Sequence, residues 1–96
     1  MSDETLEVRR KRLRFRAWHR GTKEMDLIMG KFADAHIGAL DETDLDRFEA
    51  LLEEPDDTVY GWIAGREPVP GHLDTPLFRW ISRLDFMDEP SAPSND

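Results

Sequence analysis

Residues that end helices divide this chain into five short segments, and the apolar residues of each segment recur with a helical period. After Gly21, for example, Met25, Ile28, Met29 and Phe32 fall on one helical face at spacings of three and four residues. No stretch alternates β-branched and polar residues as a strand does. The sequence therefore predicts an all-α fold, a small five-helix bundle that forms a single domain of 96 residues.

The expected bounds follow from residues that begin and end helices. We expect helices over residues 5–20 and 22–37, from Asp41 or Thr43 to residue 54, from Asp56 or Asp57 to residue 65, and from Asp74 or Thr75 to residue 87. Pro55 stops the third helix because the residue before a proline is pushed out of the helical region. Residues 1–4 are expected to fray, residues 5–87 to form the domain, and residues 88–96, a polar tail with nothing to bury, to be disordered.

The charge of the chain is distributed asymmetrically. Residues 1–23 hold eight of the 13 Lys and Arg and three of the 21 Asp and Glu, a net charge of +5, whereas residues 24–96 carry −13. This pattern indicates either a partner with an acidic surface or docking of the first helix on the acidic body of the same molecule. A third reading is nucleic-acid binding, since Phe15 and Trp18 interleave with the basic residues, but the acidic body would repel nucleic acid.

Several classes of protein are disfavoured. The chain has no cysteine, no apolar run near the ~18 residues of a membrane span, and no P-loop, GxGxxG or HExxH motif. We therefore expect no catalytic, cofactor-binding or metal-binding residues and no insertion into a membrane. His36 lies on an apolar helical face and is expected at the edge of the core. The early acids Asp3, Glu4 and Glu7 argue against a transit peptide, which favours the bacterial cytoplasm over the mitochondrial matrix.

One short stretch, from Arg20 to Glu24, joins the basic and acidic parts of the chain. Gly21 stands where a helix ends, and Thr22 can cap the following helix. On the structural interpretation, Arg20 lies in the last turn of the first helix and Glu24 in the first turn of the second, where the helix dipoles favour these charges. On the functional interpretation, the corner displays a guanidinium and a carboxylate side by side to a partner.

This stretch and its context resemble the signature of the succinate dehydrogenase assembly (flavinylation) factor family of the SdhE type. The motif Arg20-Gly21-Thr22-Lys23-Glu24 is followed by Met25-Asp26 and preceded by the pattern Arg12-Leu13-Arg14-Phe15. Further on, Glu54-Pro55-Asp56 leads to Trp62. The resemblance covers residues 9–86. His19 stands where members of this family often carry another basic residue.

The resemblance implies a compact five-helix domain that binds the flavoprotein subunit of succinate dehydrogenase, and in some bacteria that of fumarate reductase. Such proteins promote covalent attachment of FAD to a histidine of that subunit. The partner-binding residues expected here are Arg20, Gly21, Glu24, Asp26, His19, Arg12, Phe15 and Arg16. We expect no stably bound cofactor, since the FAD belongs to the client, and a monomer when the chain is free. The alternatives are a nucleic-acid-binding regulator and a small FAD-carrying protein.

Overall fold

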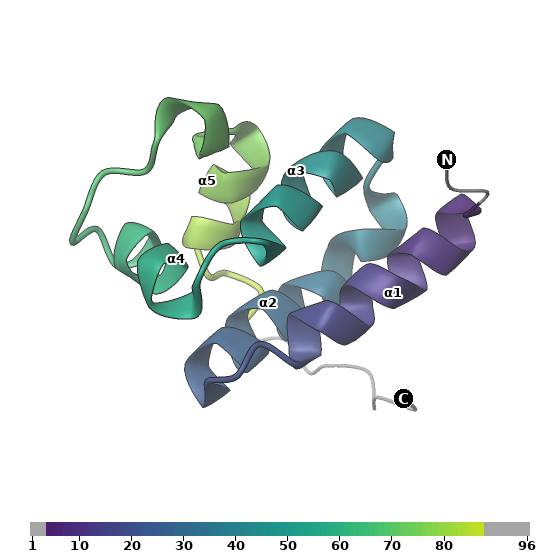
Figure 1. Cartoon of the computed structure of the whole chain (residues 1–96), viewed down its shortest axis with the longest axis horizontal. Coiled ribbons are helices and arrows are strands. Elements are labelled where there is room, and N and C mark those ends of the chain that lie inside the picture. The colour runs from purple at the N-terminus through teal and green to yellow at the C-terminus, as the bar shows by residue number, and fades with distance from the viewer. Residues whose placement is uncertain (1–3, 88–96) are drawn as a thin grey trace.

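A computed structural model describes residues 4–87 and confirms the all-α fold (Figure 1). Its elements are α1 (Leu6–Trp18), α2 (Lys23–His36), the 3₁₀ turn η1 (Ile37–Ala39), α3 (Glu42–Leu52), α4 (Asp56–Ile63), the 3₁₀ turn η2 (Gly71–Leu73) and α5 (Pro76–Ser82). Residues 4–87 contain no strand. The prediction of a disordered tail over residues 88–96 lies outside the described residues.

Helices α1 and α2 lie side by side, and α3 lies alongside α1 (Figure 1). The close approach of α1 and α2 depends on Gly30, as its place inside a helical period suggests. A Cβ atom on Gly30 would lie only 2.2 Å from the Trp18 ring, so the indole covers this glycine directly. The Trp18 indole N–H also donates to Asp34 Oδ1 at 3.2 Å. The end of α1 is thereby attached to the middle of α2.

The core is centred on Phe32 of α2. Its ring lies 5.7 Å from that of Phe48, 5.1 Å from Trp80 and 5.4 Å from Phe86, measured between ring centroids. His36 is partly buried at the border of this cluster, with its ring 4.3 Å from Trp80. The expectation that His36 lies at the edge of the core is confirmed. These aromatic contacts join α2, α3 and α5 into one core.

Four helices begin with side-chain caps, and the caps of α2, α3 and α5 are among the residues that the sequence predicts for this role. The hydroxyl or carboxylate oxygens of Thr5, Thr22, Asp41 and Thr75 accept hydrogen bonds from the amides of Val8, Met25, Asp44 and Phe78. These bonds satisfy amides that the helix itself leaves without a partner. Helix α4 begins at Asp56 as expected, but its N-cap residue is Pro55, which contributes no side-chain hydrogen bond.

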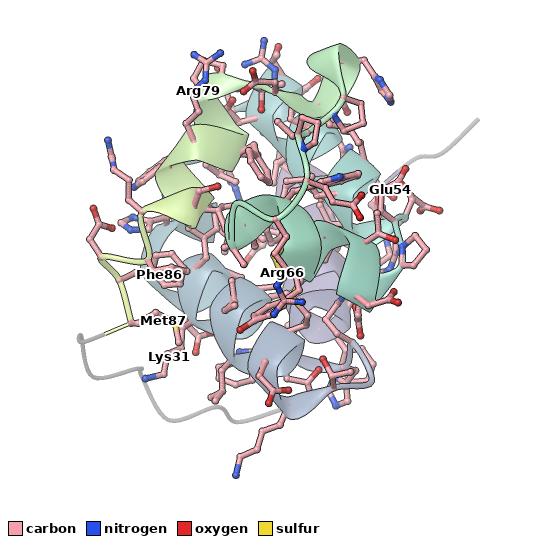
Figure 2. The ribbon with its side chains drawn as sticks, turned by 90° about the vertical axis from the view of Figure 1, so that its left-hand side faces the viewer. Lys31, Glu54, Arg66, Arg79, Phe86 and Met87 are labelled. Carbon is pink, nitrogen blue, oxygen red and sulfur yellow. The ribbon has the colours of Figure 1, made fainter. Side chains whose placement is uncertain are left out.

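The prediction that the fifth helix continues to residue 87 is wrong. Helix α5 ends at Ser82, and Leu84 adopts a φ of 57°, which turns the chain back toward the core. Phe86 is 1% exposed as a result and contributes to the core from outside any helix. Lys31 then donates to the carbonyl oxygen of Met87 at 3.1 Å, which attaches this segment to α2 (Figure 2).

The first described residue, Glu4, is attached to α1. It belongs to the segment expected to fray, yet its carboxylate accepts hydrogen bonds from Arg12 at 2.7 and 3.0 Å.

None of the helices described between residues 4 and 87 combines the length and the apolar character required to cross a membrane.

Candidate partner-binding site

The corner between α1 and α2 contains the motif that runs from Arg20 to Glu24. Helix α1 ends at Trp18, with His19 as its C-cap, so the prediction that Arg20 lies in the last helical turn is wrong. Gly21 has a φ of 118°, a backbone conformation that residues with a side chain rarely adopt. This conformation fits the predicted role of Gly21 at the end of a helix. The Thr22 hydroxyl oxygen then accepts from the Met25 amide at 3.3 Å and starts α2.

Arg20 points into the molecule, and its predicted contact with a partner stays a prediction. Its side chain is 9% exposed, and its Nε donates to Asp56 Oδ1 at 2.7 Å. Its two terminal nitrogens donate to the carbonyl oxygens of Leu52 and Glu54, in the segment that joins α3 to α4. The expectation of a guanidinium displayed beside Glu24 is therefore wrong, because the end of α3 and the start of α4 supply a complete set of acceptors.

Asp26 holds the corner from the other side. Its Oδ1 accepts hydrogen bonds from the backbone amides of Arg20 at 2.5 Å and Gly21 at 3.3 Å. These two amides lie beyond the end of α1 and have no intrahelical partner. Asp26 thus has a clear structural role, and its predicted contact with a partner stays a prediction.

Glu24 differs from Arg20 in its environment. It lies in the first turn of α2, is exposed, and forms no ion pair with any residue in the range 4–87. Thr22 and Lys23, its neighbours in the motif, are exposed as well. The rigid corner therefore presents the segment from Gly21 to Glu24 to solvent, with the Glu24 carboxylate pointing outward.

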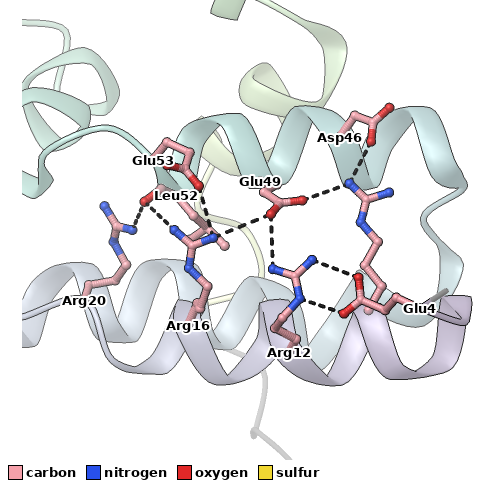
Figure 3. Close-up of polar contacts among 9 residues, drawn as sticks. Glu4, Arg12, Arg16, Arg20, Asp46, Glu49, Leu52 and Glu53 are labelled. Carbon is pink, nitrogen blue, oxygen red and sulfur yellow. Dashed lines mark hydrogen bonds and ion pairs between the residues drawn. The ribbon is translucent and has the colours of Figure 1, made fainter. Parts of the chain in front are cut away.

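Three of the basic residues of α1 face α3 (Figure 3). Arg9 contacts Asp46 at 2.6 Å and Glu49 at 2.9 Å. Arg12 contacts Glu49 at 3.1 Å, and Arg16 contacts Glu53 at 3.2 Å. Of the three explanations for the charge asymmetry, docking of the first helix on the acidic body is confirmed. The roles predicted for Arg12 and Arg16 in binding a partner stay predictions, and both residues are already engaged within the molecule.

Glu49 stands at the centre of this network. Its burial raises the pKa of the carboxyl group, but the hydrogen bonds from Arg9 and Arg12 outweigh burial and leave the pKa below its usual value of 4.5. Hydrogen bonds raise the pKa of both guanidinium groups, those to Asp46 and then Glu49 for Arg9, and those to Glu4 and then Glu49 for Arg12. The folded protein therefore favours the ionised form of Glu49.

We expect Glu49→Gln to lower the free energy of unfolding at neutral pH by about 1 kcal/mol, since the network is partly exposed. Because the folded pKa is lowered, this stabilisation is present above the unfolded value of about 4.5 and is lost as the pH falls through the folded value. The difference between the wild type and Glu49→Gln should thus shrink between about pH 5 and pH 3. Urea unfolding followed by circular dichroism at several pH values measures it. A difference that stays constant over this range would contradict the assignment.

Phe15 and His19 occupy the outer surface of α1. Their rings stack with centroids 4.0 Å apart, and Phe15 is 53% exposed. Val8 is also 53% exposed and lies on the same helical face, about two turns before Phe15. This apolar surface faces away from the core and is accessible to a partner, although the contacts predicted for Phe15 and His19 stay predictions.

Two residues beside the corner were not predicted from the sequence. Asp56 was expected only to start a helix, yet it is the ion-pair partner of Arg20, 36 positions away. Tyr60 lies with Glu24 along a surface pocket of about 200 Å³ between α2 and α4. The only signal for Asp56 in the sequence is its place in Glu54-Pro55-Asp56, and none was available for Tyr60.

Within residues 4–87, no group of three or more His, Asp or Glu side chains is placed to hold a metal ion.

Known proteins are similar to this chain over most of its length. The model of a family described as "Flavinator of succinate dehydrogenase" matches residues 11–85, which include the whole corner. The chain is 39% identical over 79 residues to the protein named FAD assembly factor SdhE of Acetobacter pasteurianus, covering 82% of this chain and 72% of that protein.

Eukaryotic proteins are similar as well. The Dictyostelium discoideum protein named succinate dehydrogenase assembly factor 2, mitochondrial, is 33% identical over 76 residues, covering 79% of this chain and 54% of its own length. A protein of the same name from Scheffersomyces stipitis is 39% identical over 59 residues, covering 62% of this chain and 40% of that protein. The chain thus spans less than two thirds of these two relatives. With a family match over most of its length, this chain belongs to the family described as "Flavinator of succinate dehydrogenase".

Proposed function

We propose that this chain is an assembly factor without catalytic residues of its own, which binds the flavoprotein subunit of succinate dehydrogenase and promotes covalent attachment of FAD to it. The flavoprotein subunit of fumarate reductase is a second candidate client. Family membership and the names of its relatives support this function. The observation that carries it is the corner of residues 20–24, which lies within the family match and presents at Glu24 an exposed carboxylate that forms no ion pair within residues 4–87.

The contribution of this chain is to hold its client in one geometry. Arg20, Gly21 and Asp26 fix the corner before binding, so little conformational entropy is lost when a partner docks. A partner held in this way can keep its reactive histidine and its flavin within attack range, which lowers the barrier to bond formation. In this proposal the chain itself holds no FAD and the chemistry of attachment stays within the client.

The alternatives receive less support. A nucleic-acid-binding regulator would need free cations on α1, but Arg9, Arg12 and Arg16 are paired with acids of α3. An FAD-carrying protein would need a nucleotide-binding motif, and the sequence contains neither a P-loop nor a GxGxxG motif. The bacterial cytoplasm stays the predicted compartment, while the names of two of the relatives given above place those proteins in mitochondria.

The test is covalent flavin on the dehydrogenase flavoprotein subunit, measured by in-gel fluorescence in cells that lack this protein. Wild type should restore the fluorescence, and Glu24→Lys should reduce it roughly tenfold, the effect of about 1.4 kcal/mol of lost binding. Glu42→Lys is the matched control because Glu42 is also exposed and lies in the first turn of α3, at the other end of α2. Both variants should melt within a few degrees of wild type.

Full fluorescence with a folded Glu24→Lys variant would overturn the assignment of the corner. Fluorescence that does not depend on this protein at all would overturn the function. Gly21→Arg is a less specific probe, since any side chain at a φ of 118° strains the backbone and lowers stability together with binding.

A further inference from the structure

Two adjoining pockets lie between α2 and α4, and both are lined by Glu24 and Tyr60. The first pocket, of about 200 Å³, adds Thr22, Met25, Asp56 and Asp57. The second, of about 240 Å³, adds Leu27, Ile28, Ile63, Ala64, Leu84 and Met87. We call the two pockets together the α2–α4 groove. Figure 2 views the molecule from the side of α4 and labels Met87, one of the residues that line the second pocket.

The groove is mainly apolar in the second pocket and contains carboxylates in the first. The residues that only the second pocket contains are all apolar. Glu24 and Asp57 are exposed, and neither forms an ion pair within residues 4–87, whereas Asp56 is occupied by Arg20. Apolar surface beside such exposed acids suits a segment that carries an apolar side chain next to a cation.

We propose that the α2–α4 groove binds a segment of the client in which an apolar side chain enters the second pocket and a neighbouring Lys or Arg pairs with Glu24 or Asp57. This inference rests on the proposed function and extends it from the corner to a specific surface. Glu24 connects the two, since it is both the exposed carboxylate of the corner and a wall of both pockets. The interface thereby continues without a break from residue 21 to the end of α4.

Other occupants fit the groove less well. Residues 88–96 follow Met87 directly, but they bring the acids Asp88 and Glu89 and no large apolar residue. A second copy of the chain would bring together two surfaces from a region with a net charge of −13. A client segment with a positive charge meets neither objection.

The first arm of the test fills the second pocket. Ala64 is exposed and has the ordinary helical values of φ −77° and ψ −5°, so Ala64→Trp can be accommodated by the backbone and would obstruct the pocket. Ala35→Trp is the control, because Ala35 is an exposed alanine on α2 that lines neither pocket. Titration calorimetry with the purified flavoprotein subunit, before FAD attachment, measures binding. Ala64→Trp should raise Kd at least tenfold, and Ala35→Trp should change it less than about twofold.

The second arm tests the cation. Glu24→Gln and Asp57→Asn should each weaken binding, and the two together should flatten the dependence of Kd on salt concentration. Glu42→Gln should leave both Kd and its salt dependence unchanged. If Ala64→Trp weakens binding while the carboxylate variants leave the salt dependence as in wild type, the groove takes an apolar group alone and the cation is rejected.

The outcomes separate this inference from the proposed function. If wild type fails to bind the flavoprotein subunit and fails to restore flavinylation, the function itself is wrong. If wild type binds, Glu24→Lys abolishes binding and a folded Ala64→Trp binds like wild type, the corner stands and the groove is rejected. A wild-type dimer in analytical ultracentrifugation that Ala64→Trp dissociates would assign the groove to self-association. Tighter binding of the client after removal of residues 88–96 would mean that this tail is the segment that occupies the groove.

Discussion

Arg20→Met is expected to lower the free energy of unfolding by about 3–5 kcal/mol, the cost of breaking a buried ion pair by removing one partner. The Arg20 and Asp56 side chains are only 9% and 13% exposed, so the variant leaves a carboxylate without its cation in a largely dry site. The carbonyl oxygen of Glu54 loses its side-chain donor as well, and that of Leu52 keeps only Arg16, at 3.4 Å. Guanidinium-induced unfolding followed by circular dichroism measures the loss.

Arg79→Met is the matched control for this experiment. Arg79 also forms an ion pair, with Asp74 at 3.0 Å, but the two side chains are 65% and 39% exposed. Its loss should cost less than about 1 kcal/mol. A similar small loss for Arg20→Met would mean that the corner does not depend on this side chain, and the structural role argued for Arg20 would be wrong.

Phe86→Ala is expected to cost about 3–5 kcal/mol, the usual penalty for deleting a buried aromatic side chain. Phe86 is 1% exposed and packs edge-on against Phe32 with ring centroids 5.4 Å apart. Its removal would leave a cavity at the centre of the core and release the segment after α5. Because domains of this size are stable by only about 5–15 kcal/mol, the variant should lose a large part of its stability. Thermal and urea unfolding both measure this.

Phe15→Ala is the control, as the same chemical change at a position that is 53% exposed. It should alter the free energy of unfolding by less than about 0.5 kcal/mol. Equal losses for the two variants would contradict the assignment of Phe86 to the core. Since Phe15→Ala should fold normally, its effect on flavinylation also tests the predicted contact between Phe15 and a partner.

The residues of the motif have different roles. Arg20 and Gly21 shape the corner, one through a buried ion pair and the other through its backbone conformation. Glu24 is the residue that faces outward. A defect in flavinylation caused by a change at Arg20 or Gly21 therefore has to be compared with the loss of stability before it is assigned to a lost contact with the client.

The sequence alone determined the local features of the fold. Thr22 was recognised as a cap, Thr75 as one of two candidate caps, and Gly21 as a helix terminator, because these roles depend on bonds within three or four residues. The apolar period identified five helices for the same reason. The family motif located the candidate corner, although its chemistry alone left two interpretations open.

Only the tertiary structure decided how these helices meet and which motif residues remain free for a partner. Arg20 is satisfied by Asp56, 36 positions away, and Arg9 by Glu49, 40 positions away. Phe86 reaches the core only because Leu84 turns the chain, and Glu24 faces a groove only because α4 packs beside α2. Such contacts join residues that are distant in the sequence, so their partners are set by the packing of the whole domain and not by any local pattern.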